Sequence, residues 1–225
     1  MSYVKRFWDN DKGFLWLLAL TLLFIISTQF SVGQVADTFL VRLGFFAFTV
    51  LAISASVLSR RYKTIGYGVA IALLSLGLLN IKNRSLIMTW SYSIVLTCYV
   101  IFVFVLLVKQ IFNGESITLR KIGGGIAAYL MLGHLWTTFY MSIYLVYPEE
   151  FMAGGELISP DEALRQLSYF SFITLTTTGY GDITAVGRLA RTLVIFEGII
   201  GQLFPAIFIA KLVSQEIEDS KKRQA

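Results

Sequence analysis

Two Gly-Tyr-Gly tripeptides stand far apart in this sequence, and both have residue types that can coordinate a cation. One occupies residues 66–68 in TIGYG and the other residues 179–181 in TTTGYGD. A cation stripped of water needs about six to eight oxygen ligands. Successive backbone carbonyls can face one axis only where alternate residues adopt conformations open chiefly to glycine. Either tripeptide could supply one wall of a cation site, and the elements around it decide which one does.

The composition places this chain in a lipid bilayer. Of its 225 residues 56% are hydrophobic and 15% charged, and the mean hydropathy is +0.70, which is too apolar for a soluble domain. Six apolar stretches approach or exceed the roughly 17 to 25 residues of a spanning helix: residues 14–30, 43–58, 65–79, 86–108, 122–147 and 189–213. Arg60, Arg61 and Lys63 separate the second from the third, and three unpaired cations cannot lie in hydrocarbon. Six spans are therefore predicted, not five.

The basic residues indicate the orientation of these spans. With six spans, thirteen of the nineteen Lys and Arg residues fall on the side of the termini: Lys5, Arg6, Lys12, Arg60, Arg61, Lys63, Lys109, Arg120, Lys121, Lys211, Lys221, Lys222 and Arg223. The other six are Arg42, Lys82, Arg84, Arg165, Arg188 and Arg191. The positive-inside rule then predicts a multi-pass protein with both termini in the cytoplasm. This topology accounts for the basic pI, so no nucleic-acid partner is expected.

Metal and redox chemistry have little support in the sequence. The chain has one cysteine, Cys98, and one histidine, His134, which cannot form a metal cage within one chain. No nucleophile, base and orienting group stand together, so the protein is predicted not to be an enzyme. His134 is expected to be a packed residue and not a pH sensor.

The connection between the last two spans, residues 148–188, is the longest and is predicted to lie outside. Ser159, Pro160 and Glu162 have the form of a helix start, with a capping Ser, Pro at the first position and a capping-box Glu. Residues 163–177 then favour a helix that is too short to cross the membrane. Such a half-helix would enter and return, with its negative C-terminal end directed at a cation. The glycines at 179 and 181 follow directly, and since one chain supplies one wall, a symmetric oligomer is required.

This combination of six spans, re-entrant helix, TTTGYGD and long final helix resembles the tetrameric potassium-channel superfamily, closely over residues 122–213. The resemblance implies an all-α transmembrane fold of six spanning helices, a re-entrant pore helix and a selectivity-filter loop, assembled as a homotetramer. It also implies passive passage of K⁺ across the cell membrane in contact with lipid. K⁺ would be the permeant ion, and no cofactor is expected.

The resemblance assigns roles to particular residues. The ion-binding oxygens are expected from five residues, the first four of them direct K⁺ ligands: Thr177, Thr178, Gly179, Tyr180 and Gly181. Asp182 would lie at the outer mouth. Gly201 and Pro205 would form a gating hinge in the inner helix, where Pro205 removes one intrahelical hydrogen bond.

Several positions depart from the family pattern. Thr178 stands where many members have Val or Ile, and its extra hydroxyl needs a partner. Tyr169 and Phe170 replace a pair of tryptophans that commonly supports the filter, and Ile173 stands where some relatives have an acid. Glu197 lies deep inside the last span, where it either tunes the cavity or gate or is a hydrogen-bonding support behind the filter.

The outer connection carries an acidic cluster that fourfold repetition would turn into a negative vestibule. Its members are Glu149, Glu150, Glu156, Asp161, Glu162 and Asp182. The competing interpretation is a solvated loop whose acids only keep it soluble.

The organisation predicted from these features has three parts. Residues 1–115 form a sensor-like four-helix domain, residues 116–215 the pore domain, and residues 216–225 a short cytoplasmic tail. Steep voltage gating is not expected, because the fourth span has no basic residue in its interior, whereas a sensor needs several. Regulation by a soluble ligand would require a separate regulatory chain.

The predicted function is that of a potassium-selective channel. The alternatives are a non-selective cation channel, favoured if Thr178 loosens the filter, and a non-conducting scaffold or auxiliary subunit. The upstream TIGYG follows cytoplasmic cations and runs into an apolar stretch, so it is predicted to begin a spanning helix. Gly66 and Gly68 would then ease helix packing, and Tyr67 would lie at the membrane interface.

Overall fold

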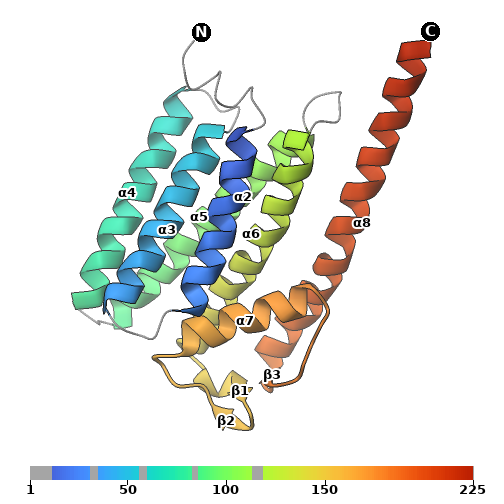
Figure 1. Ribbon diagram of the computed structural model, residues 1–225. Helices are drawn as coiled ribbons and strands as arrows, with labels where there is room; N and C mark the ends of the chain where they lie inside the picture. The colour runs from blue at the N-terminus through green and yellow to red at the C-terminus, as the bar shows by residue number, and fades with distance from the viewer. Residues whose placement is uncertain (1–11, 31–34, 56–59, 83–85, 113–118, 225) are drawn as a thin grey trace.

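The computed structural model describes residues 12–30, 35–55, 60–82, 86–112 and 119–224, which are mostly helical (Figure 1). The helices of the N-terminal part are α2 (Lys12–Gln29), α3 (Val35–Ala55), α4 (Arg60–Lys82), α5 (Leu86–Phe112) and α6 (Leu119–Tyr144). The elements that follow are η1 (Pro148–Glu150), β1 (Phe151–Ala153), β2 (Glu156–Leu157), α7 (Ala163–Leu175), β3 (Ile183–Ala185) and α8 (Arg188–Gln224). Lys5, Arg6 and Arg84, used above in the count of charges, and the predicted domain boundary at 115/116 lie outside these ranges.

Helices α2 to α6 lie side by side as a bundle, and α7 crosses one end of it next to the short strands (Figure 1). α5 packs against α6, and α2 packs against both α3 and α6. Fully buried Phe48, Val100, Val103 and Met131 contribute to the core between them. α8 contacts α7 and also α6, where Phe208 lies against Gly125 and the Lys121 ammonium donates to Gln215 at 3.5 Å. Much of α8 is nonetheless exposed in the single chain.

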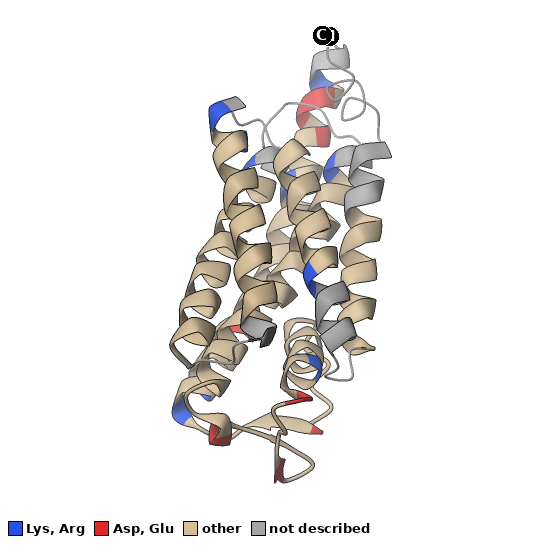
Figure 2. Cartoon of the chain, turned by 90° about the vertical axis from the view of Figure 1, so that its left-hand side faces the viewer, with Lys and Arg blue, Asp and Glu red and all other residues tan. Residues whose placement is uncertain are grey.

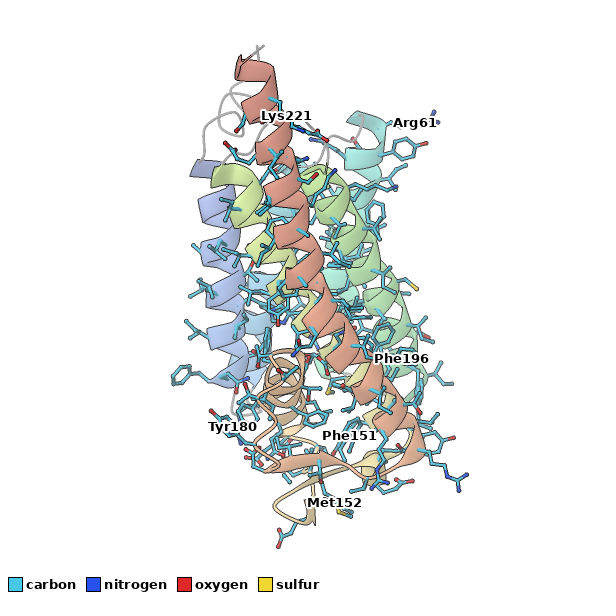
Figure 3. The ribbon with its side chains drawn as sticks, turned by 90° about the vertical axis from the view of Figure 1, so that its right-hand side faces the viewer. Arg61, Phe151, Met152, Tyr180, Phe196 and Lys221 are labelled. Atoms are coloured by element: carbon cyan, nitrogen blue, oxygen red, sulfur yellow. The ribbon has the colours of Figure 1, made fainter. Side chains whose placement is uncertain are left out.

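The helices are those of a membrane protein. Within the described residues, three helices are long and apolar enough to cross a membrane: Arg61–Leu79, Ile87–Lys109 and Arg188–Lys221. Leu18–Gln29 and Arg42–Ser54 are shorter apolar helices. The predicted count of six spans stays a prediction. Arg61 and Lys221 lie at the end of the molecule opposite Phe151 and Met152 (Figure 3), so the basic ends of α4 and α8 share one side.

The helix of the predicted second span, residues 43–58, begins earlier than its apolar stretch, because α3 already starts at Val35. Arg42 therefore lies inside α3 and not in an outer connection. It is half-buried, and its guanidinium lies 5.4 Å from the centre of the Tyr92 ring. An aromatic face offers a cation partial compensation for lost water, which explains how a helix interior accommodates a residue that hydropathy places outside it.

The final helix is longer than predicted. α8 runs unbroken for 37 residues through Pro205, which corresponds to about 55 Å at 1.5 Å per residue and exceeds the roughly 30 Å hydrocarbon core of a bilayer. Residues 216–224, predicted as a separate tail, continue this helix. Their Glu, Gln, Lys and Arg side chains have good helix propensity and favour this continuation.

The upstream Gly-Tyr-Gly is helical, as predicted from its surroundings. Gly66 to Gly68 lie in the first half of α4. Gly66 is buried beside Ile53, and its carbonyl oxygen accepts a hydrogen bond of 3.3 Å from the Tyr99 hydroxyl. The tripeptide therefore presents no column of free carbonyls.

Candidate cation site

The C-terminal end of α7 is closed by backbone hydrogen bonds from the residues that follow it. The amide of Thr178 donates to the carbonyl of Ile173 at 2.8 Å, and the amide of Thr177 donates to that of Thr174 at 2.9 Å. This pair of bonds is a Schellman motif, whose C′ residue must adopt a left-handed conformation. Thr177 takes that position with a φ of 58°. No sequence pattern predicted this motif here, because its C′ residue is usually glycine.

Left-handed residues alternate along the loop that follows. Thr177, Gly179 and Gly181 have φ values of 58°, 53° and 80°, whereas Thr178 and Tyr180 between them do not have positive φ. This is the alternation that lets successive carbonyls face one axis, and Thr177 extends it beyond the two glycines predicted. Residues 176–182 are all exposed in the single chain. A methyl group added at Gly179 or Gly181 would meet nothing within 4 Å, so this face of the loop is open.

Threonine hydroxyls hold the inner part of the loop. Thr176 Oγ1 donates to the Phe172 carbonyl at 2.7 Å, so the 3.0 Å contact between Thr176 and Thr178 requires the Thr178 hydroxyl to be the donor. The extra hydroxyl of Thr178 thus has a partner. Thr177 Oγ1 accepts a hydrogen bond of 3.2 Å from Gln202 on α8, which connects the first residue of the alternating stretch to the final helix.

The outer end of the loop is fixed by strand pairing. β3 follows the loop and pairs with β1, with Met152 opposite Thr184, and β2 completes a three-stranded antiparallel sheet. The carbonyl of Asp182 accepts a hydrogen bond of 2.9 Å from the Gly154 amide. The Asp182 carboxylate raises the pKa of Tyr169, mainly through a hydrogen bond. Tyr169 thereby connects the middle of α7 to the outer mouth.

Glu197 on α8 is fully buried against α6 and α7. Its carboxyl group is hydrogen bonded to the Tyr140 hydroxyl and lies 2.6 Å from Ser171 Oγ. Ser171 Oγ also lies 2.8 Å from the carbonyl oxygen of Gly133. The single hydroxyl proton of Ser171 cannot be donated equally to both the Glu197 carboxyl and the Gly133 carbonyl. A neutral Glu197 carboxyl can instead donate its own proton to Ser171 Oγ, which leaves the Ser171 proton for the Gly133 carbonyl. The group lies behind α7 and connects three helices.

Aromatic and close backbone contacts complete the support of α7. Phe170 is buried, with its ring 5.3 Å from that of Tyr140. The Tyr129 hydroxyl donates to the Leu175 carbonyl at 3.0 Å. Gly201 lies directly against the same carbonyl, where a Cβ atom would overlap with the oxygen. Gly201, predicted as a hinge, is therefore also a close-packing position between α8 and the end of α7.

The acidic residues of the outer connection do not share one environment. Asp and Glu residues lie along the loops around the short sheet (Figure 2). Glu149, Glu156 and Asp161 are exposed, and Glu162 pairs with Arg165. Glu150 instead accepts a hydrogen bond of 2.8 Å from the Ala190 amide in the first turn of α8. Glu150 caps α8 although it lies 40 residues away in the sequence, a role that sequence reasoning missed. With Glu162 paired to Arg165 as well, the predicted vestibule has two free carboxylates fewer.

Helix α7 also begins later than predicted. Residues 160–162 form a turn, and the helix starts at Ala163 without a side-chain cap. The proposed capping box fails because the Glu162 carboxylate accepts from Gln166 at 2.7 Å and pairs with Arg165 instead. The capping pattern located the helix but placed its first residue too early.

Known proteins resemble this part of the chain. Residues 122–217, which run from α6 into α8, match the model of a family described as Ion channel. A segment of 61 residues, 27% of this chain, is 36% identical to Protein LctB of Geobacillus stearothermophilus and covers 42% of that protein. This chain thus aligns with less than half of that relative's length, and no solved structure matches. The segment that matches the ion-channel family model contains α7, the alternating loop and Glu197.

Proposed function

We propose that this protein is a homotetrameric potassium channel, which passes K⁺ passively through a filter formed by residues 177–181 of four subunits. The observation that carries the proposal is the alternation of left-handed residues at Thr177, Gly179 and Gly181, on an open face next to a buried, capped half-helix. It lies inside the ion-channel match. Stacked carbonyl rings that replace the hydration shell are a known basis of K⁺ selectivity.

Potassium is favoured over a non-selective cation pathway by the fixed geometry around the loop. The direct ligands would be oxygens of Thr177, Thr178, Gly179 and Tyr180. The Thr178 hydroxyl, which could have loosened the filter, is held by Thr176 at 3.0 Å. Asp182 at the outer mouth is held through its carbonyl and faces Tyr169.

Two exposed surfaces of the single chain support the tetramer, one on the loop and one on α8. Tyr180 is 73% exposed, and its neighbours in the loop are exposed as well. α8 carries a series of exposed large apolar side chains: Leu189, Ile195, Phe196, Ile199, Ile200, Leu203, Ile207, Ile209, Val213 and Ile217. Copies of α8 around an axis, with lipid outside, would cover both regions.

Gating is assigned to α8 and not to the first four helices. The described part of α5 has a basic residue, Lys109, only in its last turn, so steep voltage dependence is not expected. Pro205 has no amide proton to donate to the carbonyl of Gly201, four residues earlier. This weak point lies where Gly201 touches the end of α7, so bending at Gly201 and Pro205 would move α8 relative to the filter. Any soluble regulator would act through a separate chain.

The charge distribution supports insertion in a cell membrane with both termini in the cytoplasm. The filter end would then face outward. In this proposal the sensor-like domain ends near residue 115 and the pore domain ends near residue 215.

The test is an ion-flux assay with the purified protein in K⁺-loaded liposomes. We expect K⁺ efflux that barium blocks, and a bi-ionic reversal potential that strongly favours K⁺ over Na⁺. Equal permeability to both ions would instead identify a non-selective cation channel. Absence of flux from folded tetramers would favour the scaffold, and the oligomeric state is measured on the same preparation by native mass spectrometry.

A further inference from the structure

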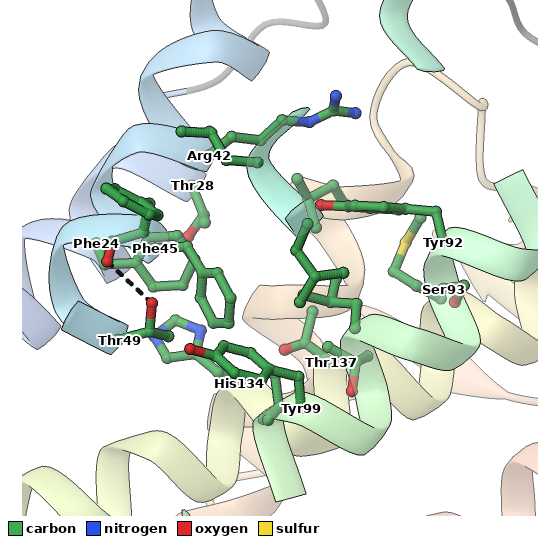
Figure 4. Close-up of a pocket in the computed structure, with 18 of the residues that line it drawn as sticks. Phe24, Thr28, Arg42, Phe45, Thr49, Tyr92, Ser93, Tyr99, His134 and Thr137 are labelled. Carbon is green, nitrogen blue, oxygen red and sulfur yellow. Dashed lines mark hydrogen bonds between the residues drawn. The ribbon is translucent and has the colours of Figure 1, made fainter. Parts of the chain in front are cut away.

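A cavity of about 250 Å³ lies inside the helix bundle, away from the loop at 177–181 (Figure 4). Its wall is formed by residues from α2 to α7 and is mainly apolar, with Phe24, Phe45, Leu73, Leu96 and Val100 among the lining side chains. Arg42 lies on one side of it, and His134 with Tyr99 lies on the opposite side (Figure 4). The proposed ion pathway makes no use of this space.

Three polar groups on the wall lack hydrogen-bond partners among the described residues. They are Nη1 of Arg42, Nε2 of His134 and Oγ of Ser168. His134 is 5% exposed and Ser168 is fully buried. A buried polar group without a partner costs free energy, and the guanidinium of Arg42 is the one of these groups that carries a full charge, so a ligand that supplies an acceptor to Arg42 would be stabilised here.

Arg42 determines the charge of that ligand. Its guanidinium contacts the Tyr92 ring at 5.4 Å, and no Asp or Glu among the described side chains pairs with it. A guanidinium inside a helix bundle is most stable when an anion binds it through paired hydrogen bonds, as carboxylates do. Ordered water alone fits poorly, because cavities with such apolar walls tend to remain dry.

The apolar wall determines the rest of the ligand. A multiply charged phosphate compound would bury more negative charge than one arginine can balance. A two-chain phospholipid exceeds the volume, since pockets for whole drug-sized ligands begin at about 300 Å³. A single alkyl chain with one carboxylate matches both the charge and the apolar wall.

We infer that this cavity binds a medium-chain fatty-acid carboxylate, with its head group on Arg42 and its alkyl chain among the aromatic and aliphatic side chains that face Phe24 and Val100. Leu164 and Ser168 of α7 line the same cavity, as do His134 and Thr137 of α6. The bound acid would therefore touch α7, the half-helix that ends at Leu175. Binding itself requires no ion conduction.

The test uses the full chain in nanodiscs of zwitterionic lipid, photolabelled with a diazirine-bearing ten-carbon carboxylic acid. We expect the label on cavity-lining residues of α2, α3 and α5. Unlabelled decanoate should prevent labelling at about one tenth of the concentration that decanol needs, because the ionic hydrogen bonds exist only with the acid. Label spread over membrane-facing residues such as Ile94 and Ile101, without protection by decanoate, would overturn the inference.

Matched variants separate the head-group contact from general membrane partitioning. Arg42→Gln should remove the preference for decanoate over decanol, Arg42→Lys should retain much of it, and Arg61→Gln, on the exposed start of α4, should leave it unchanged. Leu73→Phe, which fills the cavity, should reduce labelling whatever the head group, so the idea remains testable if Arg42→Gln does not fold. An unchanged preference in Arg42→Gln would overturn the assignment of Arg42. Since labelling is measured without ion flux, its failure and that of the proposed channel function are distinguishable.

Discussion

The two Gly-Tyr-Gly tripeptides have identical residues and different structures. In α4 the tripeptide at 66–68 is an ordinary stretch of helix, in which Gly66 is buried against Ile53. After α7 the tripeptide at 179–181 has alternating left-handed residues and an exposed backbone. Glycine therefore permits the filter-like conformation but does not impose it.

The filter-like conformation is imposed by the helix that precedes the tripeptide, α7, and by the elements that contact the loop at 177–181. α7 ends in a Schellman motif at Thr177, which turns the chain out of the helix just before Gly179. α4 has no such stop, so its carbonyls are used within the helix. The loop at 177–181 is then held by Thr176 and Gln202 inside and by the β1–β3 pair outside.

The largest expected difference between the two tripeptides is in ion flux. Gly179→Ala places an L side chain at a positive φ, which costs about 1–2 kcal/mol in each subunit and disturbs every carbonyl ring of a fourfold filter. K⁺ flux in liposomes should be lost. Gly68→Ala, in open space on a helix, should retain it. Equal effects of the two substitutions would break the distinction between the tripeptides.

The next largest effect is expected on the free energy of unfolding, at the buried group around Glu197 behind the proposed filter. The tripeptide at 66–68 has no comparable buried carboxyl group beside it among the described residues. Glu197→Ala leaves the hydroxyls of Tyr140 and Ser171 without their buried partner and opens a cavity, so unfolding should become easier by about 3 kcal/mol. Glu197→Gln keeps the shape, an acceptor for Tyr140 and a donor for Ser171, so it should cost less than about 1 kcal/mol. Thermal unfolding in nanodiscs measures both. Similar losses would contradict a neutral Glu197.

A smaller effect is expected at the outer support. Glu150→Ala removes the cap from the first turn of α8, which is worth about 1 kcal/mol. Amide hydrogen exchange at Ala190 should accelerate several-fold. Glu149→Ala, at an exposed neighbouring position, should leave that rate unchanged, and a matching acceleration there would remove the special role of Glu150.

The smallest effect concerns the helical tripeptide. Tyr99→Phe deletes the 3.3 Å hydrogen bond to the Gly66 carbonyl and should cost about 0.5–1 kcal/mol. Flux and selectivity should not change, as measured in the same liposomes. A change in selectivity would mean that the α4 tripeptide takes part in the ion pathway after all.

Much of the arrangement was predictable because it depends on local patterns. Hydropathy and the cations at 60–63 predicted the helical character of α4, and length with a turn signal predicted a short α7 before the second tripeptide. Hydropathy wrongly placed Arg42 outside a helix. An arginine that packs on Tyr92 and lines a cavity cannot be distinguished by hydropathy from an arginine at a helix end. The capping pattern placed the start of α7 too early, because the Glu162 side chain contacts Arg165 and Gln166 and does not cap the backbone.

Composition, charge and glycine spacing were sufficient to predict the apolar helices, the helical state of the tripeptide at 66–68 and the residues proposed to coordinate a cation. Only the tertiary structure decided that Thr177 is left-handed, that Glu197 joins Tyr140 and Ser171, and that Glu150 caps α8. It also decided that Arg42 faces a cavity. Apart from the turn at Thr177, these features depend on contacts between residues far apart in the chain, whose free energy no local pattern records.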